Sequence, residues 1–262
     1  MTFSQFRFIA KSAKDAKFAK KGNSILVLLF LALLASSALL AMPLERGEAQ
    51  AAESATTKPV AKPLIVSREE WGSQPQPIPD SRKQIPRFIT IHHAGVDWKA
   101  GRDPAAFVKT MQQWGQREKG WPDLAYHFLI APDGRIFEAR SMEYEPESNT
   151  KYDLKGHLGV ELMGNFETQR PSQKQVESCV KLVAWLCQEK HIDPSQIAGH
   201  KDRAEKQTVC PGKDVYRYLQ SGQFVGWVKQ TVDGQSPAID LGPPLEDGPT
   251  VVVDTPGPAT RP

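Results

Sequence analysis

Cysteine is scarce in this chain, and so is any surplus of charge. The 262 residues include three cysteines, an odd number, so disulfide bonds cannot pair all of them. The formal net charge is +3; residues 1–51 hold seven Lys and Arg against three Asp and Glu, a surplus of +4, which leaves −1 for the rest. This balance implies no basic face for nucleic acid, and we expect no nucleic-acid partner. No internal repeat is visible.

The first 51 residues are typical of a targeting segment. Basic residues between Arg7 and Lys21 precede the uncharged, mainly apolar run 25–42, which with its flanks (24–44) is long enough to span a bilayer. Ala49-Gln-Ala51 fits a small-x-small cleavage site. A cleaved signal peptide and an uncleaved single-pass anchor both remain open. Either would place residues from 52 onward in the cell envelope, periplasmic or extracellular, with membrane contact only through this segment.

Composition divides the remaining chain into three parts. Residues 52–63 form a polar, proline-bearing linker. Residues 64–231 are enough for one compact domain with a full core, which we expect to be monomeric. Residues 232–262 are rich in Gly, Pro and Asp, and we expect a disordered tail.

Within the domain, strand-like and helix-like segments alternate. We expect strands at 87–92, 125–130, 135–138 and 157–163, and helices at 104–119, from 171 to about 190, and over 211–228. Residues 131–134 have the chemistry of a hairpin turn, and Ser172 with Gln175 has the pattern of a helix-capping box. The predicted fold is α/β, a single mixed central β-sheet with helices on its faces, preceded by the signal or anchor helix.

Two histidines and one cysteine form a candidate zinc site. His92 ends an apolar strand, and His200 and Cys210 bracket a polar loop more than a hundred residues later. Zinc prefers imidazole and thiolate ligands, and a hydrolytic site uses three so that the fourth position stays open. Six histidines and three cysteines offer several other triples, but the strand end before the site and the Cys-Pro-Gly turn at 210–212 favour this one.

The other two cysteines fit a helix better than a disulfide. Cys179 and Cys187 are eight residues apart in a helical pattern, roughly 12 Å along the axis. That separation exceeds what a disulfide tolerates, so we expect both to be small core side chains. Cys210 is then the unpaired thiol.

Glu161 is the most unusual polar residue in the predicted core pattern, since apolar residues flank it on both sides. Two readings stay open from the pattern alone. It is either a solvent-facing residue on an ordinary strand or a general acid or base beside a metal site.

Alternation along the strand after Ala125 favours core packing for Tyr126 and a structural role for His127. His93 points to the face opposite His92 and cannot join it at one metal in regular geometry. The remaining histidines, 157 and 191, have no context that suggests a ligand.

Six segments together resemble one family, the zinc-dependent N-acetylmuramoyl-L-alanine amidases of the phage lysozyme and peptidoglycan recognition protein type (amidase type 2). They are, in order, Ile65-Val-Ser-Arg-Glu-Glu-Trp-Gly72, Ile89-Thr-Ile-His-His-Ala-Gly95, Gly120-Trp-Pro-Asp-Leu-Ala-Tyr-His-Phe128, Asp133-Gly-Arg-Ile-Phe-Glu138, Leu158-Gly-Val-Glu-Leu-Met-Gly-Asn-Phe166, and Gly199-His-Lys-Asp202 with Thr208-Val-Cys-Pro-Gly212. They span nearly the whole globular part.

The resemblance implies roles for individual residues. It makes His92, His200 and Cys210 the ligands of a Zn²⁺ ion. Tyr126 matches a tyrosine near the metal, which overturns the core-packing reading. Thr208 and Glu161 complete the implied catalytic set: Thr208 matches a lysine or threonine that assists catalysis, and Glu161 matches a general base proposed in some bacterial members.

Two stretches depart from the family pattern. Relatives often carry a Gly-x-His element after the hairpin, and here the corresponding stretch, 141–152, has no histidine. The loop from His200 to Cys210 is also longer than in the phage enzymes.

The implied function is zinc-dependent hydrolysis of the amide between N-acetylmuramic acid and L-alanine in peptidoglycan or muropeptides. A peptidoglycan-binding module without activity is the alternative; such members tend to lack the cysteine ligand. A third reading is a zinc hydrolase acting on another amide, such as that of an anhydro-muropeptide.

Overall fold

A six-stranded mixed sheet forms the centre of the domain. The computed structural model describes residues 59–253, and the predicted signal or anchor segment 1–51 lies outside this range. Strands run in the order β1-β4-β3-β5-β2-β6. Their bounds are β1 Ile65–Val66, β2 Phe88–His93, β3 Phe128–Ile130, β4 Ile136–Glu138, β5 His157–Leu162 and β6 Ile197–Gly199. β3 and β4 form the predicted antiparallel hairpin, and the other neighbouring strands pair in parallel.

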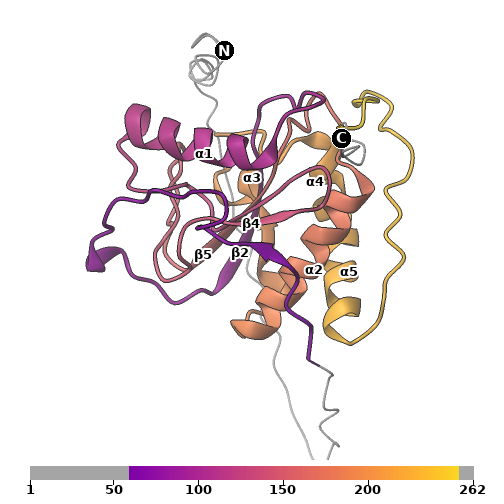
Figure 1. Ribbon diagram of the computed structural model, residues 1–262. Coiled ribbons are helices and arrows are strands. Elements are labelled where there is room, and N and C mark those ends of the chain that lie inside the picture. The colour runs from indigo at the N-terminus through magenta and orange to yellow at the C-terminus, as the bar shows by residue number, and fades with distance from the viewer. Residues whose placement is uncertain (1–58, 254–262) are drawn as a thin grey trace, which may run out of the picture. The chain divides into compact units, whose positions relative to one another are not determined.

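Helices cover the sheet, as the sequence predicts. The α-helices are α1 Pro104–Trp114, α2 Gln173–Glu189, α3 His200–Arg203, α4 Lys213–Gln220 and α5 Gln223–Val232, with shorter helical turns η2 Asp80–Arg82, η3 Gly115–Lys119 and η4 Pro194–Gln196. α2 and α5 lie side by side, and α1 lies apart from that pair, beyond the strands (Figure 1). Within the described range, no helix is long and apolar enough to cross a membrane.

Side-chain caps define where the two long helices begin. Asp103 accepts hydrogen bonds from the amides of the first turn of α1, and Pro104 occupies its first position. Ser172 caps α2 by accepting from the Gln175 amide at 3.1 Å. Gln175 does not turn back to close the predicted capping box; its side-chain amide donates to the carbonyls of Ile130 and Met163 and so ties α2 to β3 and to the end of β5.

Alternation along the strands gives the sheet one apolar face and one mixed face. In β2 and β5, the fully buried Ile89, Ile91, Leu158 and Val160 share the first face. The second face carries the register pairs Thr90 with Gly159 and His92 with Glu161. Cys179 and Cys187 are buried and free on α2, as expected for core side chains.

The chain after α5 differs from the expected disordered tail. We call residues 233–253 the C-terminal strap. At the bridge between Arg170 and Val252, the Arg170 amide donates to the Val251 carbonyl and the Val253 amide donates to the Arg170 carbonyl; Val253 is only 1% exposed. Carbonyl groups of the strap also accept bonds from Arg217 and Tyr218. Residues far away in the sequence therefore pair with backbone groups of a segment that has no regular structure of its own. Residues 254–262 lie outside the described range.

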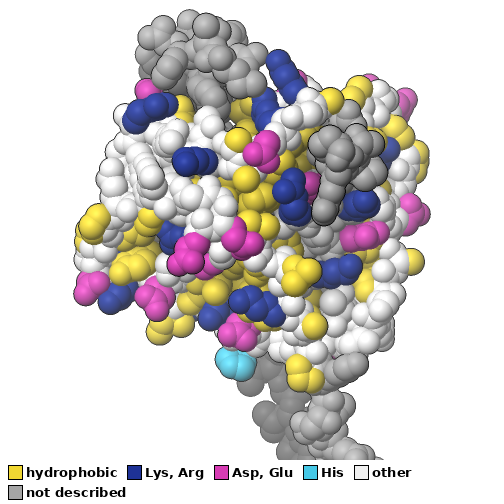
Figure 2. Space-filling view, in the orientation of Figure 1, with side chains coloured by type: hydrophobic (Ala, Val, Ile, Leu, Met, Phe, Trp, Pro, Cys, Tyr) yellow, Lys and Arg dark blue, Asp and Glu magenta, His cyan; other side chains and the backbone are white. Residues whose placement is uncertain are grey.

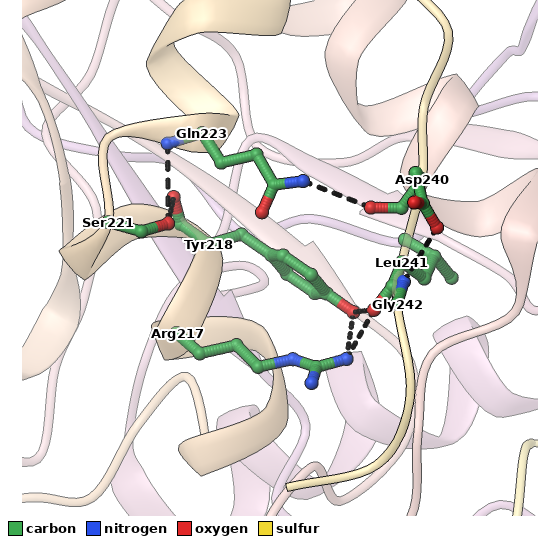
Figure 3. A pocket seen from close by; sticks show the side chains of 7 residues that line it. All are labelled: Arg217, Tyr218, Ser221, Gln223, Asp240, Leu241 and Gly242. Atoms are coloured by element: carbon green, nitrogen blue, oxygen red, sulfur yellow. Dashed lines mark hydrogen bonds between the residues drawn. The ribbon is translucent and has the colours of Figure 1, made fainter.

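A small cavity of about 280 Å³ lies between the strap and the α4–α5 corner. Figure 3 shows its lining: the Tyr218 hydroxyl donates to the Leu241 carbonyl, and Gln223 donates to the carbonyl of Asp240. On the face of the molecule in Figure 2, basic and acidic side chains are intermingled.

The last residues of the predicted linker contact α2, where the Val60 amide donates to the Gln188 side chain at 2.6 Å.

Candidate metal centre

The three predicted ligands meet at one edge of the sheet. His92 lies near the carboxyl end of β2, and β6, which pairs in parallel with β2, leads directly into His200 at the start of α3. Cys210 lies on the loop before α4. Because carboxyl ends of parallel strands share one edge, ligands far apart in sequence converge there. One ligand atom from each residue lies within 4.8 Å of the other two, and the His92 Nδ1 atom is 3.6 Å from the Cys210 Sγ atom.

Backbone contacts hold the Cys210 thiol in place. The His93 amide donates to Sγ at 3.3 Å, and the Lys201 amide donates to the Cys210 carbonyl at 2.8 Å. The Thr208 hydroxyl oxygen accepts from the Cys210 amide at 3.0 Å. The thiol is buried, so it is not the exposed cysteine that a polar loop suggests. These hydrogen bonds connect the loop that carries Cys210 to the end of β2 and to the start of α3.

Burial sets the charge state of the ligand set. Desolvation lowers the pKa of His92 well below its usual range and that of His200 to about 4, so both imidazoles are neutral and keep a lone pair. Burial also raises the pKa of the Cys210 thiol. A buried thiolate needs a nearby cation, and two neutral imidazoles with one thiol are a donor set that zinc prefers. The residues present therefore fit a zinc ion.

Glu161 stands beside this cluster as a buried carboxyl group next to Tyr126. It lies on β5 between β3 and β2, in register with His92, and is 0% exposed. This burial rules out the solvent-facing reading. Neither carboxyl oxygen has a hydrogen bond of normal geometry within the described residues, and burial raises the pKa of the group well above its usual range. A carboxyl group in this state suits proton transfer.

Tyr126 lies over the same face, just before β3 begins at Phe128. Its ring centroid is 4.9 Å from that of His92, and the ring also packs partly against the core. A Cβ atom at position 159 would come within 3.3 Å of the Tyr126 ring, so Gly159 makes room for it. Burial and the neighbouring Glu161 raise the pKa of Tyr126, which keeps the hydroxyl protonated as a hydrogen-bond donor.

Three of the four histidines outside the candidate ligand set have structural partners for their rings. The His93 Nδ1 atom accepts from the Phe166 amide, and His127 bonds through both ring nitrogens to the backbone of Gly159 and Tyr144. His157 pairs with the Thr90 hydroxyl. These contacts place the three rings in the packing of the domain.

Sequence reasoning missed the residues that surround His200. Ser148 and Thr150 approach its Nε2 atom at 3.4 and 2.6 Å, and the Tyr152 ring lies 5.5 Å from its ring. All three belong to the irregular stretch that lacks the expected Gly-x-His element. Nothing in their spacing marks them as neighbours of a residue about fifty positions later.

Known proteins share both this sequence and this fold. A family profile described as N-acetylmuramoyl-L-alanine amidase matches residues 81–213, just over half of the chain. The chain belongs to this amidase family. The matched range contains all three candidate ligands together with Tyr126, Glu161 and Thr208. Members of the family are either catalytic amidases or recognition proteins without catalysis.

Similar proteins include peptidoglycan recognition proteins from insects and mammals. Peptidoglycan-recognition protein LB of Drosophila melanogaster is 28% identical over 166 residues, covering 62% of this chain and 70% of that protein. Peptidoglycan recognition protein 1 of Bos indicus is 27% identical over 158 residues, covering 60% and 82%. Among solved structures, wild-type Drosophila PGRP-LB has a TM-score of 0.53 at 26% identity, covering 60% of this chain and 93% of that one.

A second similar structure contains a bound ligand. It is the ectodomain complex of peptidoglycan recognition proteins LCa and LCx bound to tracheal cytotoxin, with a TM-score of 0.54 at 27% identity, covering 60% of this amidase-family chain and 95% of that one. These likenesses agree with the mixed sheet and its helices.

Proposed function

We propose that this chain is a zinc-dependent amidohydrolase that cleaves the amide between N-acetylmuramic acid and the L-alanine of the peptidoglycan stem peptide. One observation carries the proposal: a fully buried carboxyl group, that of Glu161, lies in register with His92 beside a His-His-Cys cluster, and neither of its oxygens makes a hydrogen bond of normal geometry with a described residue. A carboxyl group held in this way is costly in a folded protein unless it serves a reaction.

Three side chains would hold the metal and three others would handle the substrate. His92, His200 and Cys210 supply the ligands. A zinc ion bound there supplies Lewis acidity, which polarises an amide carbonyl and acidifies water. The remaining work belongs to residues of the chain itself.

Glu161 accepts the proton of the attacking water and returns it to the departing amino group. Its raised pKa makes its carboxylate a stronger base than that of an exposed glutamate, which suits a group that must take up a proton and later give it back. Tyr126 stays protonated and donates to the carbonyl oxygen as negative charge develops on it. Thr208 accepts from the Cys210 amide, which leaves its O–H to donate to the same oxygen.

The substrate class follows from the relatives. The LCa–LCx complex binds tracheal cytotoxin, and the similar proteins carry peptidoglycan recognition in their names. We assign peptidoglycan or its muropeptide fragments to this chain on that basis. The N-terminal segment 1–51, with its basic flank and apolar run, supports a place in the cell envelope, where this polymer lies.

A recognition module without catalysis is the second candidate, and family membership supports it as a class. The Cys210 thiol among neutral imidazoles weighs against it, because a binding surface needs no such cluster. A hydrolase acting on a different amide is the third candidate, and the same assay separates all three.

The test incubates the purified full-length chain, in detergent, with peptidoglycan and measures released stem peptides that carry new L-alanine amino groups. We expect zinc-dependent release. The Cys210→Ala variant should lose both metal and release, whereas the matched buried-cysteine control, Cys187→Ala on α2, should keep both. Glu161→Gln should keep the metal and lose on the order of a hundredfold or more in rate.

Four results would contradict the proposal. Equal release by Cys210→Ala removes the metal assignment, and new reducing sugar ends indicate a glycosidase instead. Retention of peptidoglycan without release indicates a recognition module. Release only from another acylated peptide indicates a different amide substrate.

A further inference from the structure

A short loop contacts the Nε2 atom of His200. We call Ser148–Tyr152 the cover loop. The Thr150 hydroxyl oxygen lies 2.6 Å from the His200 Nε2 atom, and the Ser148 hydroxyl oxygen lies 3.4 Å from it. Because Nε2 is engaged by the cover loop, Nδ1 is the nitrogen of His200 that is left for a metal.

The hydroxyl groups of the cover loop bear on which ring nitrogen of His200 carries the proton. Ser148 Oγ accepts from the Thr150 amide at 3.1 Å and lies 2.8 Å from Thr150 Oγ1. If the Thr150 hydroxyl donates to Ser148, its oxygen is an acceptor for His200. A neutral imidazole has one N–H, so an Nε2–H bonded to Thr150 leaves the lone pair on Nδ1. Metal-binding histidines almost always donate their other N–H in this way.

A side-chain clamp fixes the cover loop in front of His200. The Lys151 amide donates to Gln207 Oε1 at 2.8 Å, and Gln207 Nε2 donates back to the Lys151 carbonyl at 3.0 Å. Gln207 lies on the loop that joins His200 to Cys210. The two stretches that depart from the family pattern, 141–152 and the longer ligand loop, therefore hold each other.

We propose that Thr150 is a positioning residue of the metal centre: it accepts the Nε2–H of His200 and so presents Nδ1 to zinc, while Gln207 holds Thr150 at the required distance. This inference rests on the proposed function, because it takes His200 to be a zinc ligand. The inference gives a role to the cover loop, which lies in the stretch that lacks the Gly-x-His element of relatives.

The first test measures the zinc affinity of the full-length chain by competition with a chelator of known strength. Thr150→Val has nearly the same shape but cannot accept a hydrogen bond, and we expect it to bind zinc about 10- to 100-fold more weakly. Thr150→Ser should restore most of the affinity. Gln207→Ala should weaken binding in the same direction by a smaller factor. Thr110→Val, which removes an exposed hydroxyl on α1, is the matched control and should bind like the unaltered chain.

The second test needs no variant and covers the case in which Thr150→Val fails to fold. In the metal-free full-length chain, nitrogen chemical shifts of the His200 ring should show the proton on Nε2. A proton on Nδ1 would overturn the inference, as would unchanged zinc affinity in Thr150→Val.

The inference and the proposed function fail in different ways. If the unaltered chain binds no zinc, the proposed function is overturned, and this inference falls with it. If the unaltered chain binds zinc and releases stem peptides while Thr150→Val binds equally well, only the positioning role is overturned.

Discussion

Gly212 offers the sharpest test of how the ligand loop is packed. Its backbone has φ 87° and ψ 147°, a conformation essentially confined to glycine. A Cβ atom there would lie 2.5 Å from the Phe166 carbonyl carbon and 2.9 Å from both the Glu167 nitrogen and His93 Nδ1. Two of these are backbone atoms, which cannot rotate away. For Gly212→Ala we expect about 1–3 kcal/mol of backbone strain and about 1–3 kcal/mol of overpacking.

The control is Gly222→Ala, at the start of α5. This residue also has a positive φ of 77°, but no atom lies within 4 Å of its Cβ position, so only strain of about 1–2 kcal/mol applies. At about 2–4 °C per kcal/mol, thermal unfolding of the metal-free chain should drop by about 10 °C in Gly212→Ala and by about 4 °C in Gly222→Ala. Zinc affinity should fall only in Gly212→Ala, because that turn carries Cys210. Equal unfolding temperatures would refute the packing argument.

Three further predictions concern the rest of the domain. Burial lowers the pKa of His127 to about 3, so below pH 6.5 this imidazole is protonated in the unfolded chain but stays neutral in the folded one. At pH 5 this residue alone should lower the free energy of unfolding by about 2 kcal/mol relative to its value well above pH 6.5, and urea midpoints should fall less over this range in His127→Asn than in the unaltered chain. The Arg140 guanidinium, which is fully buried, donates to the Asp123, Leu124 and Glu145 carbonyls and pairs with Glu147; Arg140→Met should cost about 3 kcal/mol or more, and a loss below about 1 kcal/mol in urea unfolding would contradict this account. Thiol titration of the denatured, unreduced chain should count three free thiols, whereas a count of one would indicate a disulfide.

Elements with a strong local pattern were predictable from the sequence. The β-branched runs predict β2 and β5 to within one residue at each end, and Ser172 marks the start of α2. The predicted helix 104–119 instead changes at Gly115 into a π-helical turn. A Cβ atom at Gly115 would come within 3.1 Å of the Trp121 ring, so the glycine makes room for this side chain six residues later. β1 and β6 have only two or three residues, too few for alternation to show.

The C-terminal strap shows why composition misleads when partners are distant. Its Pro and Gly content predicts no regular structure, and it has almost none. The strap nevertheless has a defined position, because the guanidinium groups of Arg170 and Arg217 donate hydrogen bonds to its carbonyl groups and because Val253 is buried. No local pattern within the strap could predict those donors.

The candidate metal ligands could be singled out in the sequence because their chemistry is distinctive, whereas the loop residues near His200 could not. A histidine at a strand end and a lone cysteine in a turn stand out in the sequence. Thr150 and Gln207 lie on irregular loops, and threonine and glutamine there are usually surface residues. Their contacts with His200 and Lys151 depend on how two distant loops meet. Only the folded chain shows that meeting.

The state of Glu161 bears on the proposed hydrolysis on physical grounds. Most buried polar groups in this domain are satisfied: Arg140, His127 and Gln112 each bond to neighbours. Glu161 is buried to the same degree and has no such bond. A module that only binds peptidoglycan would gain stability by placing an apolar side chain at this position, since the carboxyl group costs free energy there. Departures from local consistency are expected where a site performs chemistry. The buried carboxyl group of Glu161 is therefore the feature on which the proposal of hydrolysis depends.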